Sequence, residues 1–211
     1  AILRDVARAA PDFLTAQVRL MRLLRQSGQL DEARDLFLRQ VWKSGYNVDE
    51  QDRLINQLSS GADTTPETTL AFLDRLDEGE ATRPIAWVRR ATVLGRLNRT
   101  AEALADYDRA AAAITLPAYA ATTHFELLMA AGRVAEAAET AQRLMADEPD
   151  DSRHAEKLVT AAAEEGRLDL AAETMETALT RHPGDWWRLF RFNRIPFAPA
   201  TVDRLYRIMV D

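Results

Sequence analysis

The sequence contains no cysteine and only eight glycines and eight prolines among its 211 residues. Without cysteine the chain forms no disulfide and offers no thiolate as a nucleophile or metal ligand, which leaves its compartment open. Long apolar runs are also missing, because the longest stretch without a charge, which includes residues 110–124, is rich in alanine and threonine and contains Pro117. We therefore expect no membrane span and no signal peptide in this sequence.

The motifs that accompany common catalytic sites are absent as well. The glycines form neither G-x-G-x-x-G nor a phosphate loop ending in Gly-Lys, and no G-x-S-x-G is present. No two histidines are spaced i,i+4, and a zinc site without cysteine would need carboxylates. The histidines are His124, His154 and His182. We expect no catalytic residue, no metal site and no cofactor, and hence that this chain is not itself an enzyme, although a catalytic domain attached to it is compatible with the sequence.

The charge balance argues against nucleic acid as a partner. The net charge is −6 and the pI about 5.2, which opposes binding to a polyanion. One segment, residues 186–194, interleaves arginine with tryptophan and phenylalanine, a pattern that can stack on single-stranded nucleic acid. The alternative is that these aromatic side chains cover the end of the fold or dock onto a following domain. Deletion of residues 185–211 tests this docking, which unchanged solubility and folding would contradict.

What the sequence does contain is a repeat. Five glycines are separated by 33, 34, 37 and 34 residues, namely Gly28, Gly61, Gly95, Gly132 and Gly166. The segments after the turns share one frame, with Asn98 in place of glycine in one of them, and small residues at Ala33, Thr68, Ala103, Ala137 and Ala171. Four residues after each small residue come Phe37, Phe72, Tyr107, Ala141 and Met175.

Each part of this unit has a physical role. Glycine or asparagine ends a helix because either residue accepts the left-handed backbone conformation. The small residue lets two helices approach closely, and the large residue one turn later fills the neighbouring space. A period near 34 with these positions predicts an array of helix pairs.

This pattern resembles the tetratricopeptide repeat (TPR) family, whose helix–turn–helix unit has this length and an A-x3-F element. Trp87, Ala91 and Leu94 match a first helix, and Pro149-Asp150 and Pro183-Gly184 match repeat-ending turns. The resemblance implies an all-α fold, a right-handed superhelical solenoid of antiparallel helix pairs. Less usual residues stand where the family prefers Gly or Ala, at Met21, Asn56, Phe125 and Val159.

We expect five repeats in residues 12–184, with boundaries at 12–46, 47–81, 82–116, 117–150 and 151–184. Residues 1–11 would be the second helix of a truncated preceding repeat, and residues 185–211 a partial repeat or C-terminal cap helices. The chain starts inside a repeat and is rich in alanine and arginine, so we expect a fragment of a larger bacterial protein, either cytoplasmic or periplasmic. The region 45–66 should be the least regular.

In the family, ligand contacts usually come from the concave face, which the first helices of successive repeats line. The resemblance therefore implies a binding site formed by Arg19, Arg22, Arg53, Gln57, Arg89 and Arg96, with Arg25 and Thr92 beside them. On this interpretation Arg22, Arg53 and Arg89 converge on an acidic segment, since a guanidinium can bind a carboxylate through two hydrogen bonds. The alternative is that these arginines are solvated or pair with carboxylates of neighbouring helices. The equivalent positions on the later first helices are mostly neutral or acidic, namely Tyr119, Thr122, Glu126, Lys157 and Glu164.

The function implied is that of a non-catalytic protein–protein interaction scaffold that binds a protein or peptide partner, with an acidic segment in the groove. The alternative is the TPR recruitment region of a larger bacterial enzyme or of a polysaccharide or secretion machine. Val18 and Arg22 replace the Lys and Asn of the family's carboxylate-clamp members, so a chaperone co-factor role is not predicted. Self-association through exposed solenoid ends is compatible with the sequence.

Overall fold

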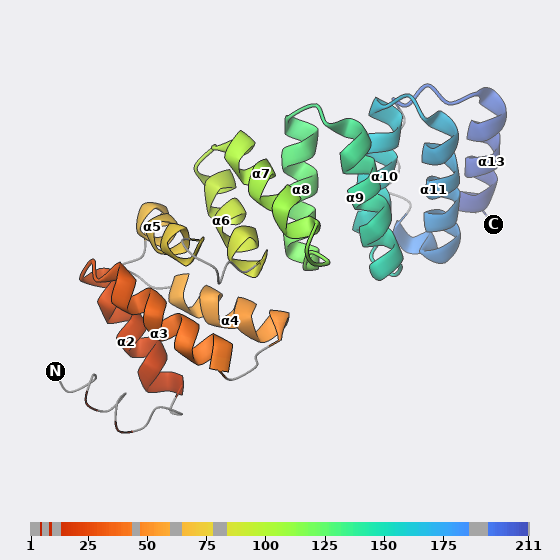
Figure 1. Cartoon of the computed structure of the whole chain (residues 1–211). Coiled ribbons are helices and arrows are strands. Elements are labelled where there is room, and N and C mark those ends of the chain that lie inside the picture. Colours follow the sequence, from red (N-terminus) through yellow and green to blue (C-terminus); the bar gives the residue numbers. More distant parts are fainter. Residues whose placement is uncertain are drawn as a thin grey trace. The chain divides into compact units, whose positions relative to one another are not determined.

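The computed structural model describes residues 5, 9, 14–43, 47–59, 65–77, 84–185 and 194–210. The regular structure in these residues is entirely helical, which confirms the predicted all-α fold, and the chain divides into two compact units. The first unit, residues 1–116, contains α2 Leu14–Gln26, α3 Leu30–Lys43, α4 Val48–Ser59, α5 Pro66–Asp77, α6 Pro84–Arg96 and α7 Thr100–Ala111 (Figure 1). The second, residues 117–211, contains α8 Ala118–Ala130, α9 Val134–Asp147, α10 Ser152–Glu164, α11 Leu168–Arg181, the short 3-10 helix η1 Pro183–Asp185 and α13 Pro199–Val210.

The N-terminal segment predicted as the second helix of a truncated repeat is described at Asp5 and Ala9, and both are helical. Of the aromatic segment 186–194, only Arg194 belongs to the described residues. The boundaries of the five repeats stay a prediction.

Local residues explain where the helices begin. Pro66, Pro84 and Pro199 are the first residues of α5, α6 and α13, where a missing N–H is harmless and the fixed φ suits a helix. α4 begins with a capping box, in which the Glu50 N–H donates to Asn47 Oδ1 at 3.0 Å and the Asn47 N–H donates to Glu50 Oε2 at 2.9 Å.

The turns between paired helices repeat one geometry. The Gly132 N–H donates to the Met129 carbonyl at 3.0 Å, and the Arg133 N–H donates to the Leu128 carbonyl at 2.9 Å. The same two bonds recur at three other turns, and the turn residues all have positive φ: Gly28 75°, Asn98 58°, Gly132 73° and Gly166 80°. This confirms the predicted left-handed closure. Gly95, in contrast, lies inside α6, so Asn98 alone closes that helix.

The small positions predicted to allow close helix contact are buried in four repeats. Ala33, Ala103, Ala137 and Ala171 are fully buried, and so, or nearly so, are the residues four positions later, Phe37, Tyr107, Ala141 and Met175. Close backbone approach at alanine followed by a space-filling side chain is therefore the packing rule of this fold.

The second repeat departs from this rule. Residues 45, 46 and 60–64, Gly61 among them, lie outside the described part, so the predicted irregularity of residues 45–66 stays a prediction. α4 packs mainly on α2 and α6, and α5 packs mainly on α3 and α6, so that α4 and α5 make few contacts with each other. Thr68 is exposed rather than buried between helices, which corrects the prediction for this residue. Its N–H donates to Oγ1 of Thr65, the N-cap of α5, at 3.2 Å, and its own Oγ1 accepts a hydrogen bond from the Thr65 N–H at 3.2 Å in return. A repeat without the buried alanine thus also lacks the tight helix pair.

In the second unit each helix from α8 to α11 packs on the next, and α13 packs on α11 (Figure 1). The core at this end is formed by small and branched side chains of α10 and α11 together with Leu205 of α13: Ala155, Val159, Ala162, Ala171, Met175, Ala178 and Leu179. Among the described residues, no helix has the length and apolarity that crossing a bilayer requires.

Candidate functional site

All six residues predicted to bind a partner lie in the first unit, on α2, α4 and α6. These three helices are neighbours, since α2 packs on α4 and α4 packs on α6. The structure therefore brings together the helices that carry the predicted site. It gives the individual side chains different roles.

Arg22 ties α2 to α4. Its Nε and Nη2 both donate to the backbone carbonyl of Gln57, at 2.9 and 2.5 Å. Gln57 is among the last four residues of α4, whose carbonyl groups have no partner within the helix. A positive charge at a helix C-terminus is also favourable. Arg22 thus caps α4 from the neighbouring first helix.

Arg89 ties α6 to α4. Its Nε and Nη2 donate to the two carboxylate oxygens of Asp52, at 2.6 and 2.5 Å. The two side chains are only 17% and 14% exposed, so this bidentate pair is largely shielded from water. The pairing of an arginine with a carboxylate of a neighbouring helix is the alternative interpretation that the sequence left open.

The remaining predicted residues face solvent. The side chains of Arg19, Arg53 and Arg96 are exposed and make no hydrogen bond or ion pair with another residue of the described part. The Gln57 side chain is exposed too. Arg19, Arg53 and Arg96 are each one or two helical turns from a residue whose side chain joins adjacent first helices, so each lies on that side of its helix. These joining residues are Arg22, Asn56 and Arg89. The assignment of these residues to a binding site stays a prediction.

Two further residues expected beside the site are not presented to a ligand. Arg25 is buried, and its burial, together with the charge of Arg22, lowers the pKa of its guanidinium. Thr92 faces α7, where its hydroxyl lies 2.9 Å from the Tyr107 hydroxyl. The i,i+3,i+6 spacing suggested a stripe, but six residues rotate a helix by about 600°, which turns Arg25 some 120° away from Arg19.

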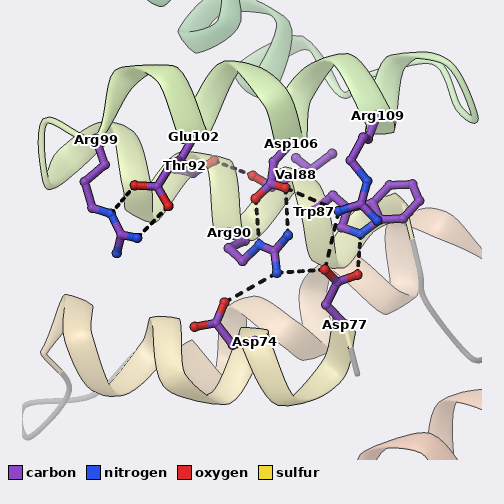
Figure 2. Close-up of polar contacts among 10 residues, drawn as sticks. All are labelled: Asp74, Asp77, Trp87, Val88, Arg90, Thr92, Arg99, Glu102, Asp106 and Arg109. Atoms are coloured by element: carbon purple, nitrogen blue, oxygen red, sulfur yellow. Dashed lines mark hydrogen bonds and ion pairs between the residues drawn. The ribbon is translucent and has the colours of Figure 1, made fainter. Parts of the chain in front are cut away.

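Sequence reasoning missed a second polar network, which joins α5, α6 and α7 (Figure 2). Arg90 lies at its centre and donates to both oxygens of the buried Asp106, at 2.6 and 2.7 Å. Its Nη1 also lies 2.8 Å from Asp77 and 3.4 Å from Asp74. The hydrogen bonds to Asp106 raise the pKa of Arg90 well above its ordinary range, despite the opposing effect of burial.

Asp77 connects this network to an aromatic side chain. The Trp87 Nε1–H donates to Asp77 at 2.7 Å, and the Arg109 guanidinium lies 4.2 Å from the centre of the Trp87 ring. Burial raises the pKa of Asp77, but the Trp87 hydrogen bond and the charge of Arg90 outweigh it, so that this pKa lies below its ordinary value. Trp87 was identified from the sequence as a repeat position, whereas its carboxylate partner ten residues earlier carries no sequence signal.

The second unit holds another cluster of polar groups. Glu148, Asp151 and His154 lie at the turn between α9 and α10, with one ligand atom of each within 4.8 Å of the others. The sequence predicted no metal site, because histidine pairs at helical spacing are absent. A six-residue spread of three different ligand types across a turn is a weak signal in a sequence.

Helix pairs closed by a left-handed residue and packed on a buried alanine define the helix–turn–helix repeat class. Residues 122–185 match the family model of the tetratricopeptide repeat. Two solved structures share the fold: YrrB (19% identity, 83% of this chain and 93% of that chain covered, TM-score 0.56) and MamA (17%, 88%, 97%, 0.55). MamA from Desulfovibrio magneticus RS-1, from its residue 41 to its end, gives 17% identity, coverage of 74% and 94%, and a TM-score of 0.51.

The family match thus covers residues 122–185, and the two solved structures show that the fold extends over most of the chain. YrrB is described as a TPR protein with an unusual peptide-binding site. No curated protein matches the sequence significantly.

Proposed function

We propose that this chain is a non-catalytic protein–protein interaction scaffold, and that α2, α4 and α6 bind an acidic segment of a partner. The observation that carries the proposal is that the arginines on these three helices have two different roles. Arg22 and Arg89 are used to hold the first helices together, whereas Arg19, Arg53 and Arg96 are exposed on the same three helices without a partner in the described part.

The chemistry of these three groups favours carboxylates. A guanidinium is planar and always charged, and it can donate two parallel hydrogen bonds to one carboxylate. Three such groups on neighbouring helices suit an extended segment with several acidic residues, because each carboxylate can meet its own arginine. The chain as a whole is acidic, so its electrostatic potential repels a long polyanion. A short acidic segment that docks next to these arginines is therefore favoured.

A peptide-sized partner is also consistent with the fold. YrrB, which shares it, is described as having a peptide-binding site, and helical arrays present preformed surfaces to extended or helical segments. The alternative, that the chain is the recruitment region of a larger bacterial enzyme or of a polysaccharide or secretion machine, stays a prediction.

The experiment is a selection of binding peptides from a random library displayed on phage, followed by fluorescence anisotropy with a labelled selected peptide. Selected sequences should be enriched in Asp and Glu. The variant Arg19→Glu/Arg53→Glu should weaken binding of that peptide at least tenfold, because it replaces two attractions by two repulsions.

A charge-matched control is available in the second unit. Arg143 and Arg207 are exposed and have no partner among the described residues, so Arg143→Glu/Arg207→Glu changes the net charge equally. This control should bind the peptide as the unaltered chain does. An equal loss in both variants, or selected peptides without acidic enrichment, would reject the site.

A further inference from the structure

The turn between α9 and α10 presents three metal-ligand side chains from one short segment. Glu148 follows α9, Asp151 precedes α10 as its N-cap, and His154 lies in the first turn of α10. His154 Nε2 lies 3.0 Å from Glu148 Oε2 and 3.7 Å from Asp151 Oδ2. The His154 side chain is only 6% exposed, whereas that of Glu148 is 49% exposed. The imidazole is thus buried, whereas Glu148 and Asp151 are among residues 147–153, which line a surface pocket.

The polar groups of the imidazole are not all satisfied by the protein. Nδ1 is buried and has no hydrogen-bond partner within the described part of the chain, so Nε2 is the only polar atom through which the ring interacts. That single nitrogen faces two carboxylate oxygens, and one N–H can be donated to only one of them at full strength. The Asp151 carboxylate also accepts hydrogen bonds from the Arg153 backbone N–H at 3.0 Å and from Arg153 Nη2 at 2.5 Å, so this carboxylate already holds one cation.

We propose that Glu148, Asp151 and His154 form a binding site for one divalent transition-metal ion of the Zn²⁺ or Co²⁺ type. The donor atoms of a tetrahedral site with bonds of about 2.0–2.1 Å lie roughly 3.3 Å apart, which the two distances of 3.0 and 3.7 Å bracket. Three protein ligands leave the remaining coordination positions open to the pocket. One imidazole with two carboxylates is a donor set that suits Zn²⁺ and its neighbours better than Mg²⁺ or Ca²⁺, which prefer oxygen alone.

Two other cations compete with a metal ion for this cluster, namely the Arg153 guanidinium and a proton. Arg153 pairs with Asp151 through its guanidinium, but its side chain is 67% exposed. An ion pair this open to solvent contributes little free energy, so a metal ion can displace Arg153 at small cost. The acidic surroundings also favour a cation, since Asp147 and Asp150 line the same pocket, and Asp185 accepts a 2.5 Å hydrogen bond from Ser152 beside it. A bound ion would join the residue after α9 to the first turn of α10 and so fix the turn between two repeats.

The test is calorimetric titration of the chelator-treated full chain with ZnCl₂ near pH 7.5, together with the absorption spectrum after addition of CoCl₂. One ion should bind per chain, with the visible bands of low-coordinate Co²⁺. Glu148→Gln should weaken Zn²⁺ binding at least tenfold, and His154→Gln should remove the cobalt bands. Glu139→Gln, which changes an exposed residue of α9, is the matched control and should bind as the unaltered chain does.

Because Glu148 is half exposed, its variant should fold normally, and this keeps the test valid if His154→Gln proves unstable. Absence of stoichiometric binding up to millimolar ZnCl₂ would overturn the proposal and leave Arg153 or a proton as the cation of this cluster. Binding that Glu148→Gln and Glu139→Gln reduce equally, or that neither reduces, would also overturn it, because the ion would then lie elsewhere on the acidic surface.

Discussion

The turn residue that closes the first helix in four of the repeats has a left-handed backbone conformation, and this requirement can be tested separately from side-chain packing. At Gly132 φ is +73°, and an added Cβ would meet no atom within 4 Å. Substitution by alanine therefore adds backbone strain without a clash. We expect Gly132→Ala to lower the free energy of unfolding by about 1–2 kcal/mol, measured by urea unfolding followed by circular dichroism.

Two variants isolate the cause. Gly132→Asn should cost less, because Asn98 already occupies the equivalent turn at a φ of 58°. Gly184→Ala is the control, since an added Cβ there also meets open space but the backbone is not left-handed. If Gly184→Ala destabilises the chain as much as Gly132→Ala, left-handed strain is not the reason.

These turns and the alanine positions were predictable because their signals are local. A left-handed turn residue and a buried Ala five positions later follow from the backbone conformation and the helix period alone, as at Gly132 and Ala137. The roles of the arginines were not predictable in the same way. Arg22 and Arg89 find their partners 35 and 37 residues away in the sequence, and a guanidinium on a long side chain can reach either a ligand or a neighbouring helix. The repeat register places such a residue on a helix face but does not decide between these outcomes.

At the level of elements, the network around Arg90 joins three helices through a largely buried ion pair. Removing one partner of such a pair leaves a charge without compensation in a poorly solvated place, which typically costs about 3–5 kcal/mol. We expect Arg90→Met to destabilise the first unit by this order, because Asp106 is buried and would lose both short hydrogen bonds. Thermal and urea unfolding measure the change.

The double variant Arg90→Met/Asp106→Leu distinguishes a stranded charge from lost packing. Replacing both partners by apolar side chains of similar size should recover most of the loss, since buried ion pairs are often no better than apolar contacts. Asp77 keeps the Trp87 hydrogen bond in this variant, so the contact between α5 and α6 is retained. A double variant as unstable as Arg90→Met would mean that the geometry of the guanidinium itself holds the helices.

At the level of the molecule, stability in a repeat array is approximately a sum of the contributions within repeats and between nearest neighbours. In the second unit α9 packs on α8 and α10, and α10 packs on α11. In the second repeat α4 and α5 make few contacts with each other, so they are held chiefly by helices of the repeats on either side. Local opening should therefore be easiest there, although the repeat lies inside the array.

Hydrogen exchange measured by mass spectrometry provides the corresponding prediction. Amides of α4 and α5 should exchange faster than those of α10 and α11. Opening α4 and α5 breaks mainly contacts between repeats, whereas opening α10 and α11 also breaks a helix pair packed on the buried Ala171. Equal protection in the two regions would contradict this explanation. Addition of the selected acidic peptide should slow exchange in α4, which lies between the other two proposed binding helices, and leave α10 unchanged, so that one measurement reports both the weak repeat and its use in binding.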